Sequence, residues 1–217
     1  MRHLKLTLLF LLLIGTGCSS PLHKKIKNYV EKCNQGDGIA CSNLGFLGDT
    51  KESGDYIRKK YQNYDNGETY KRAIAFLDNE CKSEKSASCR AAGDIYSKIG
   101  YLNSTRSGDT YKIRHVRRPD YINGGFENTG SAVLSQGYKA DLHMTINYYK
   151  AGCDLKDFRS CKSYSYIISK GPFKNIDESK NAFDRFKDLA RAKCENSGSD
   201  RDCRIWKAWQ FKPWSAN

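Results

Sequence analysis

Apolar side chains recur at helical spacing along most of the chain, in segments that short polar turns separate. The segment from Glu178 to Cys194 is the clearest, because its apolar residues recur every three or four positions and most charged residues fall between them. These apolar residues are Ala182, Phe183, Phe186, Leu189 and Ala190. Segments 71–81 and 142–153 behave likewise, so the pattern predicts an all-α protein of amphipathic helices joined by short turns.

The first seventeen residues show a different pattern. Arg2, His3 and Lys5 form a cationic start, residues 6–14 are almost entirely apolar, and residues 15–17 are small. This three-part layout is typical of a secretory signal peptide. A transmembrane helix needs about 20 apolar residues, roughly twice this run. We therefore expect residues 1–17 to be a signal peptide.

A cysteine follows the small residues. Residues 13–18, Leu-Ile-Gly-Thr-Gly-Cys, resemble a bacterial lipobox, although Gly15 stands where that motif usually has leucine. The resemblance implies that Cys18 is acylated, so that its lipid tethers the mature protein to a membrane. Ser19, rather than aspartate, implies the outer membrane, with the domain facing the periplasm. The alternative is an ordinary signal peptide followed by a free thiol.

The other eight cysteines form four close pairs in the sequence: Cys33/Cys41, Cys81/Cys89, Cys153/Cys161 and Cys194/Cys203. An even number of cysteines in an exported chain is typical of a disulfide framework. The clustering favours the four local pairings among the many connectivities possible. Structural zinc sites place cysteines two to four residues apart within a pair, so this spacing disfavours a metal. Each bridge is expected to join the end of one helix to the start of the next.

The net charge of the expected mature protein limits the classes of partner that fit it. Without Arg2 and Lys5, 35 Lys and Arg oppose 24 Asp and Glu, a net charge of +11. In a cytosolic protein this excess of positive charge would suggest that the protein binds nucleic acid. Behind a secretion signal we expect no nucleic-acid partner. An acidic protein partner, anionic lipid or cell-wall groups fit better.

Around the cysteines the chain resembles cysteine-rich Sel-one-like repeats, which are relatives of tetratricopeptide repeats. The resemblance rests on segments 148–154, 38–45 and 88–96 with their paired cysteines. It implies antiparallel helix pairs stacked in a superhelical solenoid over residues 26–211, after a tether at 18–25 and before a tail at 212–217. The repeats would be spaced unevenly, with insertions at 48–68 and 100–140.

The longer insertion holds a basic segment that alternates with apolar residues and precedes glycine-rich turns. This pattern predicts a short strand or hairpin that protrudes from the helices. Insertions in repeat proteins often lie on the binding face, so we expect the segment to contact an acidic partner. A solvated loop is the alternative interpretation. The candidate contact residues are Lys112, Arg114, His115, Arg117 and Arg118.

The sequence offers little evidence of catalytic motifs. No serine lies three residues before a lysine, so the nucleophile motif of penicillin-recognising enzymes is absent. No nucleophile elbow, HExxH motif or phosphate-binding glycine loop occurs either. We expect no catalytic residues, cofactor or metal.

Three functional hypotheses follow. The leading one is a tethered module that binds a protein, such as an immunity protein that neutralises a secreted toxin. The others are a β-lactamase-like enzyme, since some proteins with these repeats are described as such, and a structural component that binds peptidoglycan.

Overall fold

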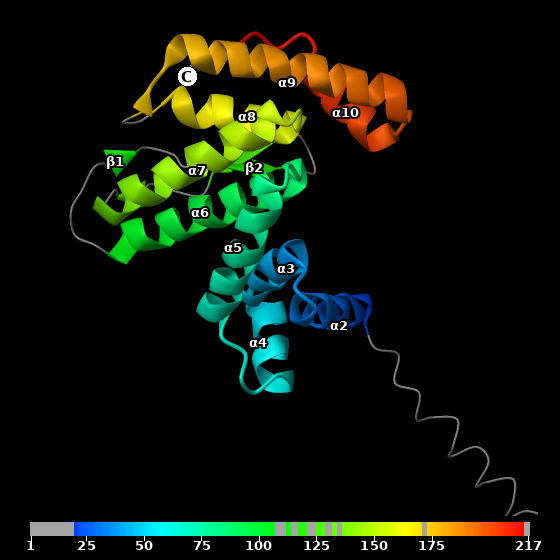
Figure 1. Ribbon diagram of the computed structural model, residues 1–217, viewed down its shortest axis with the longest axis vertical. Coiled ribbons are helices and arrows are strands. Elements are labelled where there is room, and N and C mark those ends of the chain that lie inside the picture. The colour runs from blue at the N-terminus through cyan, green and yellow to red at the C-terminus, as the bar shows by residue number, and fades with distance from the viewer. Residues whose placement is uncertain are drawn as a thin grey trace, which may run out of the picture.

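The computed structural model describes residues 20–106, 112–113, 117–120, 125–128, 132–133, 136–170 and 173–214, and between 99 and 141 only the backbone. Within these residues, nine helices follow one another along the chain (Figure 1). They are α2 (Pro21–Asn34), α3 (Gly38–Gly48), α4 (Lys51–Lys60), α5 (Asn66–Lys82), α6 (Ser86–Arg106), α7 (Gln136–Asp154), α8 (Phe158–Ile168), α9 (Ile176–Ser197) and α10 (Asp200–Trp209).

Eight of these helices form four antiparallel hairpins: α2 with α3, α5 with α6, α7 with α8, and α9 with α10. Successive hairpins pack through α3 on α5, α6 on α7, and α8 on α9, while α4 lies against α3. The stack runs from α2 at one end to α9 and α10 at the other (Figure 1). The predicted fold class, an all-α solenoid of disulfide-linked helix pairs, is confirmed.

Short strands lie between α6 and α7. Strand β1 (Lys112–Ile113) pairs with β4 (Ala132–Val133), and β2 (Arg117–Asp120) pairs antiparallel with β3 (Gly125–Asn128). The backbone thus contains the strand pairing expected in the insertion at 100–140. The other expected insertion, 48–68, contains α4 and the start of α5.

Structured residues lie beyond both predicted ends of the repeat domain. Helix α2 begins at Pro21, inside the expected tether, because Ser20 accepts a hydrogen bond from the His23 amide and proline suits the first helical position. The expected tail contains Trp214, which packs against the last core cluster, and its Nε1 donates to the Ser179 hydroxyl at 3.0 Å.

The hairpin turns share one backbone design. Each contains a residue with positive φ, three residues after the first cysteine in three hairpins and four residues after it in the last. These residues are Gly36, Glu84, Lys156 and Gly198. The longer turn at Gly198 accounts for the wider spacing of the last cysteine pair.

Helix capping completes two of these turns, whereas Ser199 before α10 forms no side-chain capping hydrogen bond. Asp37 and Asp157, each four residues before the second cysteine, accept hydrogen bonds from the amides of Ala40 and Ser160 at 2.8 and 3.0 Å. Capping side chains of this kind fix where a helix starts. In all four hairpins the two cysteines lie side by side, with Cα–Cα distances of 4.4 to 4.7 Å.

Lys156→Gly is expected to stabilise the protein, because Lys156 has φ of 65° and glycine adopts this conformation without a steric penalty. The expected gain is about 1 kcal/mol in the free energy of unfolding. Urea denaturation measures it. Lys187→Gly, in the interior of α9, is the control and should destabilise instead. A loss of stability on Lys156→Gly would contradict this account of the turn.

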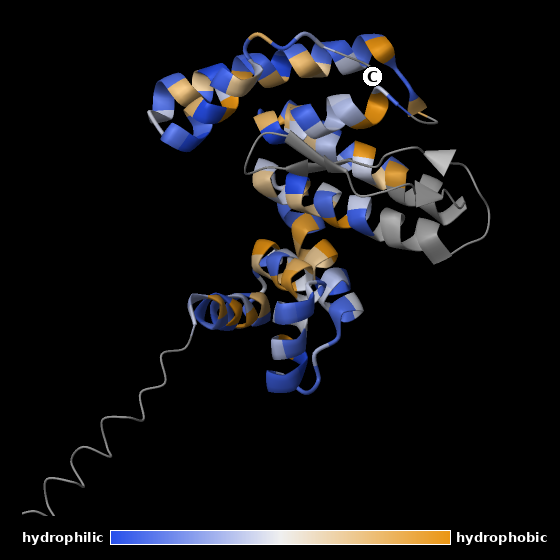
Figure 2. Cartoon of the chain, turned by 180° about the vertical axis from the view of Figure 1, so that it is seen from behind, coloured by the Kyte–Doolittle hydropathy of each residue, from blue (hydrophilic) through white to orange (hydrophobic). Residues whose placement is uncertain are grey.

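The hydrophobic core consists of several clusters along the stack of hairpins instead of one central cluster. One cluster joins α2 to α7 around Ile26, Ile57 and Leu77, and two more join α7 to the last helices around Phe186 and Tyr164. Hydrophobic residues gather around α3, whereas α4 is mainly hydrophilic (Figure 2). Each hairpin is thus stabilised chiefly by its neighbours, as expected for a solenoid.

Candidate functional site

The predicted disulfides are all present. Cys33–Cys41, Cys81–Cys89, Cys153–Cys161 and Cys194–Cys203 have Sγ–Sγ distances of 2.06, 2.04, 2.05 and 2.05 Å, respectively. The sequence prediction of local pairing is therefore confirmed.

Among the described residues, no group of three or more His, Cys, Asp or Glu could hold a metal ion, and no helix is long and apolar enough to span a membrane.

The other predicted sites fall partly outside the described residues. Cys18, Arg114 and His115 lie outside them. Lys112 lies in β1, and Arg117 and Arg118 lie in β2, opposite Asn128 and Glu127 in β3. Only the backbone is described there, so lipidation and partner binding at these residues remain predictions.

Tyrosine hydroxyls bind carboxylates across all three junctions between hairpins, which sequence reasoning missed. Tyr70 of α5 donates to Asp49, after α3, at 2.5 Å, and Tyr149 of α7 donates to Asp94 of α6 at 2.5 Å. At the third junction, Tyr164 of α8 donates to Glu178 of α9. Hydrogen bonds to ionised groups are stronger than neutral ones, so these contacts fix the angle between hairpins.

Two of these carboxylates are also neutralised by lysines. Lys98 of α6 forms an ion pair with Asp49, and the side chain of Lys98 is 11% exposed. Lys150 of α7 reaches Glu178 with an Nζ–Oε1 distance of 2.5 Å. Each lysine comes from a helix outside the Tyr–carboxylate pair, so each of these two junctions also contacts a further helix.

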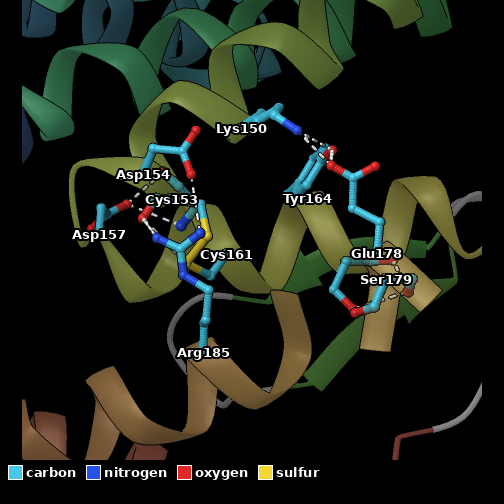
Figure 3. Close-up of a disulfide and its surroundings, with 11 residues drawn as sticks. Lys150, Cys153, Asp154, Asp157, Cys161, Tyr164, Glu178, Ser179 and Arg185 are labelled. Atoms are coloured by element: carbon cyan, nitrogen blue, oxygen red, sulfur yellow. Dashed lines mark hydrogen bonds and ion pairs between the residues drawn. A yellow bond between two sulfur atoms is a disulfide. The ribbon is translucent and has the colours of Figure 1, made fainter. Parts of the chain in front are cut away.

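The cluster of Lys150, Tyr164 and Glu178 is the described group that most resembles a reactive site (Figure 3). Lys150 Nζ also lies 3.4 Å from the Tyr164 hydroxyl. Tyr164 is buried, whereas Lys150 is half-exposed, so the cluster opens to solvent on one side. A lysine beside a tyrosine and a glutamate could in principle transfer protons.

The pKa shifts in this cluster argue against proton transfer. Burial, followed by the hydrogen bond to Glu178, raises the pKa of Tyr164 to about 12. The hydrogen bond from Lys150 lowers the pKa of Glu178, and the same contact raises the pKa of Lys150. A general acid or base works best with a pKa near the working pH, and all three shifts lead away from neutrality. The contacts described in this cluster are an ion pair between Lys150 and Glu178 and a hydrogen bond from Tyr164 to Glu178.

Glu178→Gln is expected to reduce the acid sensitivity of the fold. Because the pKa of Glu178 is lower in the folded protein, its contribution to stability is present above the unfolded pKa of about 4.3 and is lost as pH falls below it. The stability difference between parent and variant should therefore shrink between pH 5 and pH 3. Urea denaturation across this range, with Glu195→Gln as the control on α9, measures it. A difference that grows on acidification would contradict the assignment.

A second recurrent contact involves arginines at equivalent positions. Arg72 and Arg185 each lie nine residues before the first cysteine of their own hairpin. Arg72 donates to the Cys33 carbonyl at 3.2 Å, and Arg185 donates to the Cys153 carbonyl at 3.0 Å. Each arginine thus adds a second donor to a carbonyl at a helix end that already accepts a hydrogen bond from a turn amide, Gly36 N–H or Lys156 N–H. An alignment of the four first cysteines could have found this position, which α7 fills with Met144.

Some described aromatic residues are buried in the core, more are half-buried, and Phe173 and Phe211 are exposed. Tyr164 is buried, and Trp209 packs edge-on against Phe183 and Phe186. His143 is exposed on α7, with its ring centroid 5.7 Å from that of Phe173. These positions leave charged side chains as the main features of the described surface.

Comparison with protein-family models, curated proteins and solved structures found no significant match. The functional conclusion therefore depends on the geometry of this chain. The described contacts that join successive hairpins are the Tyr–carboxylate hydrogen bonds and the lysine ion pairs given above.

Proposed function

We propose that the protein is a membrane-tethered module of the bacterial cell envelope that binds another protein. In this proposal, residues 1–17 direct export, a lipid on Cys18 holds the chain at the outer membrane, and the domain faces the periplasm. The proposed kinship with Sel-one-like repeats is supported by the paired cysteines and the stacked helix hairpins. Four disulfides suit an oxidising compartment outside the cytoplasm.

The observation that carries the proposal is the rigid coupling of successive hairpins. Each hairpin is closed by a disulfide, and each junction is joined by a Tyr–carboxylate contact. A stack of this kind presents an extended surface that is already ordered before binding. Ordering costs on association are then small, which favours recognition of a folded protein over a small molecule.

The proposed contact region is the insertion between α6 and α7. It carries Lys112, Arg114, His115, Arg117 and Arg118, and its strands β2 and β3 pair antiparallel beside the stack. Together with the positive net charge of the protein, these residues favour an acidic partner. A secreted toxin neutralised at the membrane is the candidate partner, in which case the protein is an immunity protein.

Cross-linked capture of proteins from an envelope fraction tests this role. The full chain serves as bait, and mass spectrometry identifies the protein retained. Arg117→Glu with Arg118→Glu should abolish capture, whereas Arg201→Glu with Arg204→Glu on α10 should retain it as a charge-matched control. Purification of no protein above an unrelated lipoprotein bait would contradict the proposal. Protection of cells that express the captured toxin would establish immunity.

A further inference from the structure

The solvent-facing side of α2 is strongly cationic. Its four lysines are all exposed, whereas Ile26 and Cys33 on the opposite side are buried. Glu31 is the acidic residue of this helix. We call this surface the α2 cationic face and define it by Lys24, Lys25, Lys27 and Lys32.

Lys24 closes the first turn of α2, where cations are least favourable, and Lys25 and Lys27 lie in the turn that follows. The first turn contains no acidic residue. The amino end of a helix carries partial positive charge, so cations there destabilise it. By contrast, Arg58, Lys59 and Lys60 occupy the last turn of α4, where cations are favourable.

Local contacts compensate little for this charge. Within the described part of the chain, Lys27 pairs with Glu31 at 3.6 Å, and neither Lys24 nor Lys25 forms an ion pair. Lys25 lies 5.7 Å from the ring centroid of Tyr29. Residues that break a local stability rule without compensation often serve function. We therefore expect the α2 cationic face to bind an anionic ligand that is not part of the fold.

Helix α4 extends this surface with aromatic rings and a further lysine. His23 of α2 stacks on Tyr56 of α4 with ring centroids 3.7 Å apart. Lys60 donates to the Tyr56 hydroxyl at 3.0 Å, so its ammonium group lies close to the start of α2. Tyrosine rings are enriched where membrane proteins meet lipid headgroups.

The position of α2 identifies the ligand. The helix lies at the amino-terminal end of the stack, away from α9 and α10 (Figure 1). Pro21, its first residue, follows Cys18 by three positions, a span of about 10 Å at most. The range of electrostatic attraction at physiological salt is about 8 Å. A lipid on Cys18 would bring these lysines close to the range in which a charged bilayer attracts them.

We propose that the α2 cationic face binds the headgroups of anionic phospholipids and is a second membrane contact besides the lipid. The proximity argument rests on the proposed tether at Cys18, whereas the charge argument does not. Binding of this face orients the solenoid, so that α2 and α4 lie at the bilayer and α9 and α10 point away from it.

Vesicle sedimentation tests the proposal without the lipid. The chain from Ser20 onward is suitable because all four disulfides and the described core clusters lie within it. We expect it to bind vesicles of phosphatidylcholine with one third phosphatidylglycerol, and to bind pure phosphatidylcholine far more weakly. Replacing Lys24, Lys25 and Lys27 by glutamine should weaken binding about 100-fold, since each lysine contributes about fivefold.

The matched control replaces Lys180, Lys193 and Lys207, which are exposed on α9 and α10, by glutamine. It should retain nearly full binding, and the α2 variant should keep or raise the melting temperature of the parent. Equal binding to both vesicle types, or equal losses in both variants, would overturn the proposal. So would an α2 variant that loses partner capture but keeps vesicle binding. The vesicle assay contains neither Cys18 nor a protein partner. A negative result would therefore overturn the lipid contact without deciding whether the protein binds a partner, which the capture experiment tests separately.

Discussion

Replacing Cys153 and Cys161 together by alanine is expected to lower the free energy of unfolding by about 2.5 kcal/mol or more. Closing a loop of this length contributes about that amount in the chain-entropy model. Both sulfur atoms are also buried between α7, α8 and α9, so their removal leaves poorly packed space. Urea denaturation should show one cooperative transition at a lower midpoint.

The matched control is the double alanine variant of Cys194 and Cys203. The loop that this bridge closes is one residue longer, so its effect on the unfolded chain is nearly the same. However, this bridge lies in the terminal hairpin and is partly exposed. We expect faster hydrogen exchange confined to α10 and the end of α9. Identical stability losses and exchange patterns in both variants would contradict the solenoid coupling described above.

Gly93→Ala is the second substitution with a large expected effect. A Cβ atom at this position of α6 would lie 2.8 Å from Cδ1 of the Tyr149 ring in α7. The ring cannot easily move away, because its hydroxyl is bound to Asp94 at 2.5 Å. Alanine is normally the better helix residue by about 1 kcal/mol. Here we expect a net loss of about 1–3 kcal/mol from overpacking.

A double-mutant cycle with Tyr149→Leu separates overpacking from other effects. If the ring causes the loss, Gly93→Ala should cost little or should stabilise in the Tyr149→Leu background. The coupling between the two sites should then be at least about 1 kcal/mol, as measured by urea denaturation. An equal cost of Gly93→Ala in both backgrounds would show that the Tyr149 ring is not the obstacle.

The hairpins could be predicted from sequence because their causes are local. The cysteine spacing, the capping residues Asp37 and Asp157, and the apolar pattern before Cys194 all act within a few residues of one another. The junction contacts could not be predicted. Tyr164 binds Glu178 and Arg185 binds the Cys153 carbonyl only once the helices have packed in register. Helical periodicity shows which face is buried and leaves this register open.

Two core contacts lie outside the predicted bounds of the repeat domain. Leu22, within the expected tether 18–25, packs on the first core cluster as part of α2. The short tail offered no periodic pattern, and Trp214 is held there by a single long-range hydrogen bond and by core packing.

The closed hairpins also determine how the protein would respond to tension. If its two ends were pulled apart, the load would pass through the hairpins in series, because each packs chiefly on the next. The four short covalent rings cannot lengthen, so the turns between their paired helices would stay shut. Extension would instead begin where successive hairpins meet, at the junctions held by Tyr70, Tyr149 and Tyr164. The molecule would therefore extend in steps, because the hydrogen-bonded junctions would open before the disulfide-closed hairpins.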